Sequence, residues 1–214
     1  MKYNNKNLQI SCDGGAATGK TTGAKMISTK YKLKFLSSGL LYRYAGFLIK
    51  EHEPQNRLVF LEKKFKNLNY NKLKKINLHT QEISKISAEI AKVSKIRNIL
   101  KKYQLRFAKK YKNCCIEGRD ISTKILPNSK VKFYFICSLV TASKRRFKEL
   151  KKGSPNLKLK DVKKALRIRN ISDINRKNSP LLKHRDSVVI DTGKLTKQAM
   201  LKKMSKYVER ALAK

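Results

Sequence analysis

The sequence predicts an α/β protein in which a five-stranded parallel sheet is covered by helices on both faces. Five short apolar runs alternate with helical segments along the chain, and this alternation is typical of parallel sheets. The first run leads into a glycine-rich segment that is followed by a helix. Three strands end in polar segments, which a parallel sheet gathers along its ligand-binding edge. These segments are Asp13 to Lys20, Ser37 to Arg43 and Gly118 to Asp120.

Length and charge set the first limits on function. At 214 residues the chain suits a single α/β domain with small inserted subdomains. The formal net charge of +39 invites a nucleic-acid-binding interpretation. The lysines, however, are spread over the whole length and not gathered in one tail or stripe. We therefore expect a solvated lysine surface and only nonspecific, salt-sensitive binding to nucleic acids.

The sequence contains no feature of a membrane or secreted protein. No apolar run approaches the 18 or so residues that a membrane span needs, and the first seven residues are too polar for a signal peptide. The cysteines lie in or beside apolar runs without a C-x-x-C pair; they are Cys12, Cys114, Cys115 and Cys137. Small buried thiols in a reducing cytoplasm are the expected arrangement.

The first strand, Leu8 to Cys12, carries a phosphate-binding loop at its end. Gly14, four further residues and then Gly19-Lys20-Thr21 match the pattern G-x-x-x-x-G-K-[ST]. Glycines let the backbone curl so that successive N–H groups point into one concavity, to which the following helix adds the positive end of its dipole. Lys20 would reach the β and γ phosphates of a nucleoside triphosphate, and the Thr21 hydroxyl would bind Mg²⁺.

The first half of the chain continues with helices and one further strand. The expected elements are a helix from Lys20 to Lys32, a strand from Lys34 to Leu36 and a helix from Leu40 to Lys50. Residues 55–79 fit either short helices or an irregular insert. From Thr80 an apolar stripe at helical spacing predicts a helix, and another follows from Ile96 to Tyr111. The stripe consists of Ile83, Ile86, Ile90 and Val93.

The second half supplies the other three strands. They are expected at Asn113 to Glu117, at Val131 to Cys137 and at Ser187 to Asp191. Helices are expected from Thr141 to Lys152 and from Asp161 to Asn170, with a polar segment up to residue 180. Thr196 is the expected N-cap of the terminal helix.

Arginines at the ends of predicted helices and strands indicate which reaction the nucleoside triphosphate undergoes. A phosphate-binding loop alone indicates only that a nucleoside triphosphate binds. The sequence lacks the N-K-x-D pattern that reads guanine, which disfavours a GTPase. It also lacks a long apolar strand that ends in paired acids, as an ATPase motor would have. Guanidinium groups hold phosphates through two parallel hydrogen bonds, so several of them could hold two phosphorylated substrates together for phosphoryl transfer. The arginines are Arg43, Arg97, Arg119, Arg145, Arg146, Arg169 and Arg176.

With these motifs the chain resembles the bacterial cytidylate kinases over nearly its whole length. The stretches that carry the resemblance are Asp13 to Thr21, Ser38 to Arg43, Glu117 to Thr123, Pro127 to Phe133, Arg145-Arg146, and Asp173 to Leu181. The resemblance implies a three-layer α/β/α P-loop kinase fold that transfers the γ-phosphate of ATP, with Mg²⁺, to CMP or dCMP. It also implies one domain over 1–214, with a core (1–43, 108–150 and 180–214), an acceptor-binding insert (44–107) and a lid (151–179). We expect the protein to act as a monomer.

The resemblance also assigns roles to individual residues. ATP would lie on the phosphate-binding loop and its arginines, which are Gly14, Gly15, Ala16, Ala17, Thr18, Gly19, Lys20, Thr21, Thr22, Arg145 and Arg146. The acceptor would contact Ser38, Tyr42, Arg43, Arg97, Arg119, Asp120, Arg169, Asp173 and Arg176. Within this set Arg97 and Asp120 would read the cytosine edge, and Asp173 would accept from the ribose hydroxyls. The catalytic groups would be Lys20, Arg119, Arg169 and Arg176.

Several positions depart from the pattern of this family. Ser37 stands where an acid is usual, and Asn170 and Ile171 replace acids after Arg169. Ala88 replaces a serine that contacts the cytosine amino group, so that Ser84 or Ser87 substitutes for it or the base is held less selectively. Two alternatives therefore stay open: a related kinase with UMP or mixed pyrimidine acceptors, and a basic RNA-associated protein in which nucleotide hydrolysis is a switch.

Overall fold

The computed structural model describes residues 7–151, 153 and 155–213, and it contains the expected parallel sheet. Five strands lie in the order β2-β3-β1-β4-β5, and all four pairings are parallel. Their bounds are β1 Gln9–Gly14, β2 Lys34–Ser37, β3 Cys114–Gly118, β4 Val131–Ile136 and β5 Val188–Asp191. The strand predictions are therefore confirmed to within two residues at each end, and the α/β fold class is confirmed.

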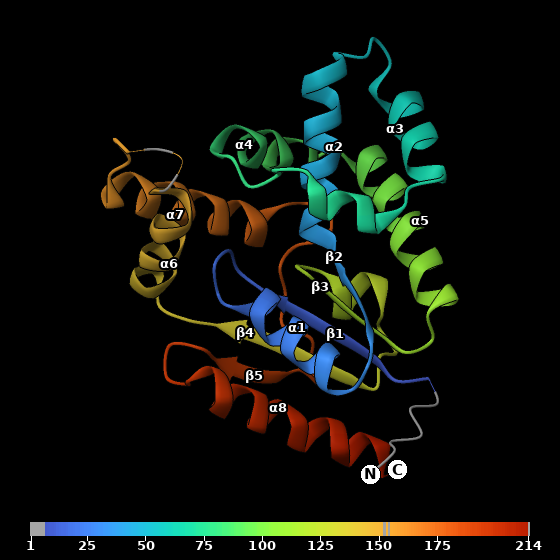
Figure 1. Cartoon of the computed structure of the whole chain (residues 1–214), viewed down its shortest axis with the longest axis vertical. Coiled ribbons are helices and arrows are strands. Elements are labelled where there is room, and N and C mark those ends of the chain that lie inside the picture. Colours follow the sequence, from blue (N-terminus) through green and yellow to red (C-terminus); the bar gives the residue numbers. More distant parts are fainter. Residues whose placement is uncertain (1–6, 152, 154, 214) are drawn as a thin grey trace.

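Helices cover both faces of this sheet (Figure 1). They are α1 Lys20–Lys30, α2 Ser38–His52, α3 Arg57–Lys66, α4 Gln81–Ile90, α5 Ser94–Lys110, α6 Leu139–Lys151, α7 Leu159–Asn175 and α8 Lys197–Leu212. Short helical turns add η1 Tyr70–Lys75 and η2 Ile121–Ile125. The expected C-terminal residue of α6, Lys152, lies outside the described residues, as do Ser154 of the expected lid, residues 1–6 of the expected core and Lys214.

Two hydrophobic clusters explain why the layers stay together. On one face, Ile10 and Cys12 of β1 pack against apolar side chains of α1 and α8. On the other face, Cys114 and Ile116 of β3 pack against α2, α5 and η2. Side chains alternate between the two faces of a strand, so neighbouring residues of β3 enter different clusters, with Cys115 in the first. Burying both faces favours the continuous apolar strands of this sequence.

The cysteines are free thiols inside this core. Cys12, Cys114 and Cys115 are buried and Cys137 is half-buried, without a disulfide among them. The Sγ atoms of Cys12 and Cys115 lie 3.7 Å apart across adjacent strands. This arrangement agrees with the expectation of small apolar side chains in strands.

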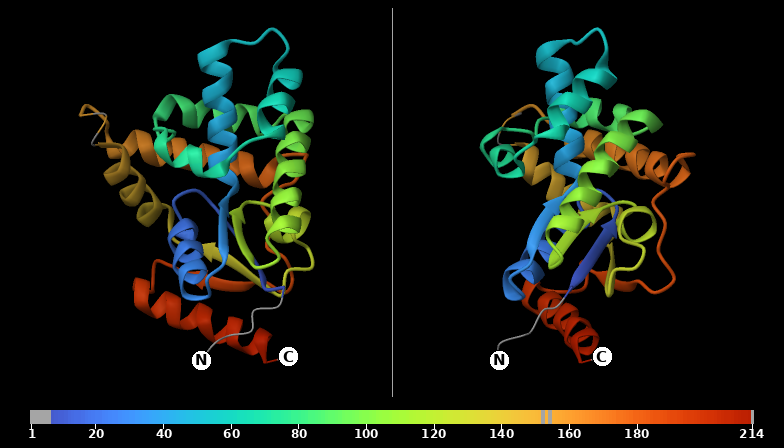
Figure 2. Two further views of the ribbon diagram at one scale, coloured as in Figure 1. Left: turned by 45° about the vertical axis from the view of Figure 1, so that its right-hand side comes forward. Right: turned by 90° about the vertical axis from the view of Figure 1, so that its right-hand side faces the viewer.

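Helices α2 to α4 extend beyond the carboxyl ends of β2 and β3, and α5 runs back along the face of the sheet (Figure 2). Residues 55–79 adopt short helices, α3 and η1, which was one of the two expected possibilities. Leu61 and Phe65 of α3 are buried, and the Arg106 side chain of α5 donates to the carbonyl of Phe65 at 2.9 Å. The division into core, insert and lid stays a prediction. No helix in the described part of the chain is long and apolar enough to cross a bilayer.

Two helix predictions need correction. Val93 does not belong to the apolar stripe of α4, because that helix ends at Ile90 and the chain turns through residues 91–93; Val93 is the N-cap residue of α5 and is exposed. Helix α7 extends five residues beyond the predicted end at Asn170. Asp173, expected in a polar loop, therefore lies in the last turn of α7, where ion pairs with two arginines hold it.

Candidate active site

The segment between β1 and α1 has the backbone geometry of a phosphate-binding loop. Gly14 leaves the strand with φ of 154°, and a Cβ atom on it would lie 2.4 Å from the carbonyl oxygen of Phe135 on β4. Gly19 takes the left-handed conformation with φ of 81° and caps the N-terminus of α1. Only glycine fits such positions without strain. The residues of the pattern thus turn the chain tightly at the carboxyl edge of the sheet.

Lys20 and Thr21 at the start of α1 meet a carboxylate that the sequence analysis did not single out. The Nζ atom of Lys20 donates to the carbonyl of Gly15 at 3.0 Å and lies 3.8 Å from Oε2 of Glu117. The Thr21 hydroxyl donates to Oε1 of the same glutamate at 3.2 Å. Ser37, in the position of the usual acid, donates to Oε1 as well. Glu117 is therefore the common partner of the loop and of β2.

The oxygen atoms around Glu117 fit a small, hard cation. Thr21, Glu117 and Ser37 offer hydroxyl and carboxylate oxygens, which Mg²⁺ prefers. The described residues contain no group of three or more carboxylate, histidine or cysteine side chains that would hold a metal without further ligands. Mg²⁺ commonly uses one or two protein ligands and takes the others from water and phosphates, so this donor set fits a metal that arrives with a nucleotide.

Guanidinium groups from several elements surround Lys20. Burial and the nearby charges of Arg119 and Arg169 together lower the pKa of Lys20 to about 7, against the opposing effect of Glu117. Burial, followed by Arg119 and Arg146, also lowers the pKa of Arg169 to about 10. The Arg169 guanidinium makes no hydrogen bond or ion pair with the described residues, and its Nε atom is buried without a partner. Positive charge is thus under-compensated beside the loop.

Arg43 lies in the same positive region. Its Nη1 atom donates to the carbonyl of Leu78 at 3.0 Å and to the Ser84 hydroxyl of α4 at 2.7 Å. Nη2 of Arg146, on α6, donates to the same hydroxyl at 3.1 Å. Burial lowers the pKa of Arg43 to about 9, and the charges of Arg146, Arg169 and Arg119 contribute in the same direction. Clustered cations with lowered pKa values indicate a site that favours an anion.

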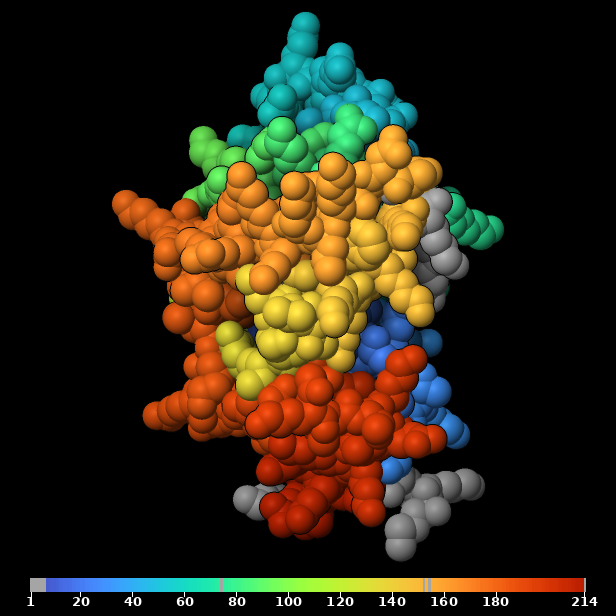
Figure 3. All heavy atoms as spheres, turned by 90° about the vertical axis from the view of Figure 1, so that its left-hand side faces the viewer, coloured from blue at the N-terminus to red at the C-terminus, as the bar shows by residue number. Residues whose placement is uncertain are grey.

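The two adjacent arginines of α6 point to different places. Arg145 donates from Nη1 to the Thr192 hydroxyl and from Nη2 to the Thr192 carbonyl, both at 2.8 Å. Thr192 in turn donates to the carbonyl of Thr18 at 2.7 Å, so Arg145 lies beside the phosphate-binding loop. Arg146 lies against Ser84. In the space-filling view, blue atoms of the loop and α1 are visible in an opening between α6 and the β5–α8 segment (Figure 3).

Helix α7 rests directly on the loop. The Ala16 N–H donates to Oδ1 of Asn170 at 3.3 Å, and Ala16 belongs to a small apolar cluster with Val162 and Leu166 of α7. The amide at position 170 accepts a backbone hydrogen bond that a lone carboxylate would also accept, but it adds no negative charge near a phosphate. Helix α7, which lies in the segment predicted as a lid, therefore packs against the phosphate-binding loop.

A chain of ion pairs extends from the phosphate-binding loop to a separate cavity between α5 and the segment after α7, which we call the second cavity. Arg119 donates from Nε to Oδ2 of Asp173 at 2.8 Å. Nη1 of Arg176 lies 3.4 Å from Asp173, and Nη2 of Arg176 lies 3.9 Å from Asp120. Arg97 pairs with Asp120 at 2.5 Å. These side chains come from α5, α7 and the end of β3, so elements far apart in sequence meet here.

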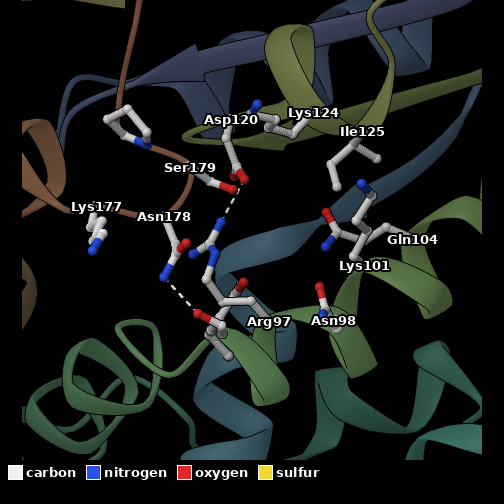
Figure 4. A pocket seen from close by; sticks show the side chains of 13 residues that line it. Arg97, Asn98, Lys101, Gln104, Asp120, Lys124, Ile125, Lys177, Asn178 and Ser179 are labelled. Carbon is white, nitrogen blue, oxygen red and sulfur yellow. Dashed lines mark hydrogen bonds and ion pairs between the residues drawn. The ribbon is translucent and has the colours of Figure 1, made fainter.

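The second cavity, of about 310 Å³, adjoins this network. Tyr42, Arg97 and Asp120 line it together with polar side chains of α5 and of the segment after α7 (Figure 4). The Arg97 guanidinium lies 5.5 Å from the ring centroid of Tyr42, and burial raises the pKa of Tyr42 to about 12, which keeps its hydroxyl protonated. The volume exceeds what a single pyrimidine base fills.

The serines that could replace the serine missing at Ala88 are engaged elsewhere. Ser84 accepts from two arginines and donates to the carbonyl of Thr80. Ser87 is buried and donates to the carbonyl of Ser84 at 2.9 Å. Neither serine lines the second cavity. Ser38 is also buried, with its Cβ atom 3.2 Å from the position that a Cβ on Gly118 would take, so it packs between the ends of β2 and β3.

Comparison of the sequence with known proteins identifies the family of this chain. The family model described as cytidylate kinase matches residues 10–210. A cytidylate kinase of Thermosipho melanesiensis is 32% identical over 210 residues, covering 94% of this chain and 96% of the relative. A cytidylate kinase of Bartonella quintana is 32% identical over 202 residues, with 92% of each chain covered.

A solved structure supports the fold independently. A shikimate kinase of Acinetobacter baumannii in complex with shikimate superposes with a TM-score of 0.51 at 13% identity, covering all of this chain and 98% of the other. At that identity the likeness concerns the fold alone. Since the family model covers nearly the whole sequence and the full-length relatives agree with it, this chain belongs to the cytidylate kinase family.

Proposed function

We propose that the protein transfers the γ-phosphate of ATP to CMP or dCMP and so forms ADP and CDP or dCDP. Family membership supports the reaction. The observation that carries the residue-level account is the convergence of Arg119 and Arg169 on Lys20, with Arg43 beside these two arginines. The pKa values of Lys20, Arg43 and Arg169 are all lowered. A site with so much uncompensated positive charge favours two phosphate groups held end to end.

In this account ATP lies on the phosphate-binding loop. The loop amides and Lys20 hold the β and γ phosphates, and Arg145 faces the same side of the molecule. Oxygen atoms of Thr21 and Glu117 would hold Mg²⁺, which supplies charge neutralisation between the β and γ phosphates. Arg119 and Arg169 then stabilise the charge of the phosphoryl group during transfer.

CMP occupies the second cavity with its phosphate directed toward Arg43 and Arg119. A phosphate oxygen of CMP is already anionic, so it forms the new bond to the γ phosphorus without a strong general base. The bond from that phosphorus to the β,γ-bridging oxygen breaks, and ADP leaves. Closure of the lid over the loop excludes water, which would otherwise receive the phosphoryl group.

An acceptor panel tests the proposal. ADP formation from ATP and Mg²⁺ is measured with CMP, dCMP, UMP and AMP at equal concentrations. We expect transfer to CMP and dCMP. Comparable rates with UMP would instead identify a kinase for several pyrimidine nucleotides, and ATP hydrolysis that depends on RNA without transfer to any nucleotide would contradict the proposal.

Two variants test the assigned machinery. Lys20→Ala and Arg176→Ala are each expected to lower turnover by about a hundredfold or more, the scale of removing a group that stabilises transition-state charge. Lys25→Ala, on the exposed face of the same helix as Lys20, is the matched control. Near-normal turnover of both site variants would exclude this mechanism.

Two further expectations concern the oligomeric state of the protein and the compartment in which it resides. All groups assigned to catalysis come from one chain, which supports a monomer. The free cysteines of the described chain support residence in the reducing cytoplasm.

A further inference from the structure

The second cavity contains a buried carboxamide with an unused hydrogen-bond acceptor. Gln104 on α5 is only 2% exposed. Its Nε2 atom donates to the carbonyl of Leu100 at 3.2 Å, but its Oε1 atom has no hydrogen-bond partner among the described residues. A buried acceptor without a hydrogen-bond partner is unfavourable. A ligand in the cavity that donates a hydrogen bond to Oε1 would remove this cost.

Gln104 lines the same cavity as Arg97 and Asp120, the two residues expected to bind the cytosine base. Arg97 and Gln104 are seven residues apart on α5, which puts them on the same face of the helix. Both line the cavity of about 310 Å³. In Figure 4 the Gln104 carboxamide extends into the cavity toward the side occupied by Arg97 and Asp120. A flat ligand between them can contact all of these side chains.

The hydrogen bond to Leu100 fixes which end of the amide faces the ligand. Because Nε2 is held by the helix carbonyl, the amide atom left without a partner is the oxygen, which only accepts. Cytosine carries a 4-amino group with two N–H donors, whereas uracil has a carbonyl oxygen at that position. A fixed acceptor therefore favours cytosine and leaves two acceptors facing each other when uracil enters.

The other candidate acceptors do not provide this contact. Ser84 and Ser87 lie outside the cavity lining, and Asp120 already pairs with Arg97 and lies 3.9 Å from Arg176. One carboxylate can take one amino hydrogen, which leaves the second hydrogen unpaired. We infer that Gln104 is a base-specificity residue whose Oε1 atom accepts from the exocyclic amino group of the acceptor nucleotide. This inference rests on the proposed function.

The test compares substrates that differ only in the amino group. The wild type and Gln104→Met, which keeps the side-chain length but removes the acceptor, are assayed with CMP, with UMP and with the 4-deamino analogue of CMP. For Gln104→Met we expect kcat/KM to fall about 10- to 100-fold with CMP, as expected when a site loses a hydrogen bond to its substrate. With the 4-deamino analogue, kcat/KM should stay within about twofold. With UMP it should rise, because the acceptor that faces the uracil oxygen is removed. Lys102→Met, exposed on the same helix, is the matched control and should change none of these values.

Stability separates this role from a purely structural one. Since Oε1 has no protein partner, we expect the Tm of Gln104→Met without ligand to be equal to or above that of the wild type. A lower Tm with equal loss of activity toward all three acceptors would assign Gln104 to packing and overturn the inference. Gln104→Leu serves the same comparison if the methionine variant does not fold.

The outcomes also distinguish the inference from the function beneath it. If the wild type phosphorylates CMP and Gln104→Met keeps the same ratio of CMP to 4-deamino activity, the inference fails and the function stands. If the wild type phosphorylates none of the pyrimidine nucleotides, the proposed function itself fails.

Discussion

The Nε atom of Arg119 donates a 2.8 Å hydrogen bond to the carboxylate of Asp173, and this contact joins the end of β3 to the last turn of α7. Asp173 also lies 3.4 Å from Arg176. Burial opposes the charged form of Asp173, but Arg119 and the other arginines outweigh it and lower the pKa of this carboxyl. One carboxylate therefore orients two of the guanidinium groups assigned to the phosphates.

Replacing that carboxylate should disturb both arginines. In Asp173→Asn, Arg119 and Arg176 lose a charged partner inside a positive region, and breaking a buried pair destabilises a protein strongly. We expect a lower Tm and a KM for CMP that rises about tenfold or more. Thermal unfolding and steady-state kinetics measure these effects, with Asp186→Asn at an exposed position as the control. Unchanged values for both would remove Asp173 from the account.

The lowered pKa of Lys20 predicts a pH-dependent affinity for ATP. Without nucleotide Lys20 titrates at about 7, below its usual value, so above that pH it is mostly neutral. The triphosphate favours the charged form, and binding at pH 8.5 must take up a proton from solution. The affinity should fall by up to about tenfold per pH unit between pH 7.5 and 9. Isothermal titration in buffers of different ionisation enthalpy measures the proton uptake.

The lowered pKa of Lys20 also makes the stability of the folded protein depend on pH. Between about pH 7 and the usual lysine pKa, the unfolded chain binds more protons at Lys20 than the folded chain does. The contribution of this group to the free energy of unfolding therefore rises with pH across that window. In Lys20→Met both the proton uptake and this contribution should disappear. Proton uptake of wild-type size in that variant would assign the effect to another group.

Glu117 should control the requirement for Mg²⁺. Glu117→Gln keeps the shape of the side chain but removes the charge next to Thr21. We expect the Mg²⁺ concentration for half-maximal activity to rise about tenfold or more, because Glu117 is proposed to hold the ion and even outer-shell partners alter metal affinity by about tenfold. Glu62→Gln, on the exposed face of α3, is the control. An unchanged Mg²⁺ dependence would mean that Glu117 acts only by orienting Lys20 and Ser37.

Ser84 should tune the acceptor phosphate site without touching catalysis directly. Its hydroxyl holds both Arg43 and Arg146. Ser84→Ala therefore removes one hydrogen bond from each guanidinium group and leaves their contacts with Leu78 and Glu149 in place. We expect the KM for CMP to rise about threefold to tenfold with little change in kcat, as for the loss of one charge-assisted hydrogen bond. Ser87→Ala, in the same helix but without an arginine contact, is the matched comparison. Equal kinetics for the two variants would exclude this role.

The parts of the account that depend on local pattern could be predicted from the sequence. Apolar runs bounded by polar segments locate the strands, because both faces of a parallel sheet are buried. Gly14 and Gly19 locate the tight turn, because their backbone angles exclude other residues. The resemblance through the arginine-containing stretches then assigned the arginines to two nucleotides.

The parts that depend on the order of strands could not be predicted in this way. Glu117 reaches Thr21 because β3 lies next to β1, with Cys12 in register with Glu117, and no local pattern specifies that neighbour. The unpaired oxygen of Gln104 is likewise a property of the packed cavity, although helical spacing places the residue on the face of Arg97. The last turn of α7 was missed because the ion pairs of Asp173 and of the following Arg176 reach Arg119 and Asp120, between β3 and η2, and are non-local.

The most direct test of the central claim is the affinity for a molecule that carries both nucleotides, adenosine and cytidine joined 5′ to 5′ through five phosphates. If Lys20 and the surrounding arginines hold two nucleotide phosphates end to end, this compound should bind at least about a hundredfold more tightly than ATP or CMP alone, and Arg119→Ala should remove most of that gain. Binding no tighter than that of ATP, in titration calorimetry with Mg²⁺, would contradict the account.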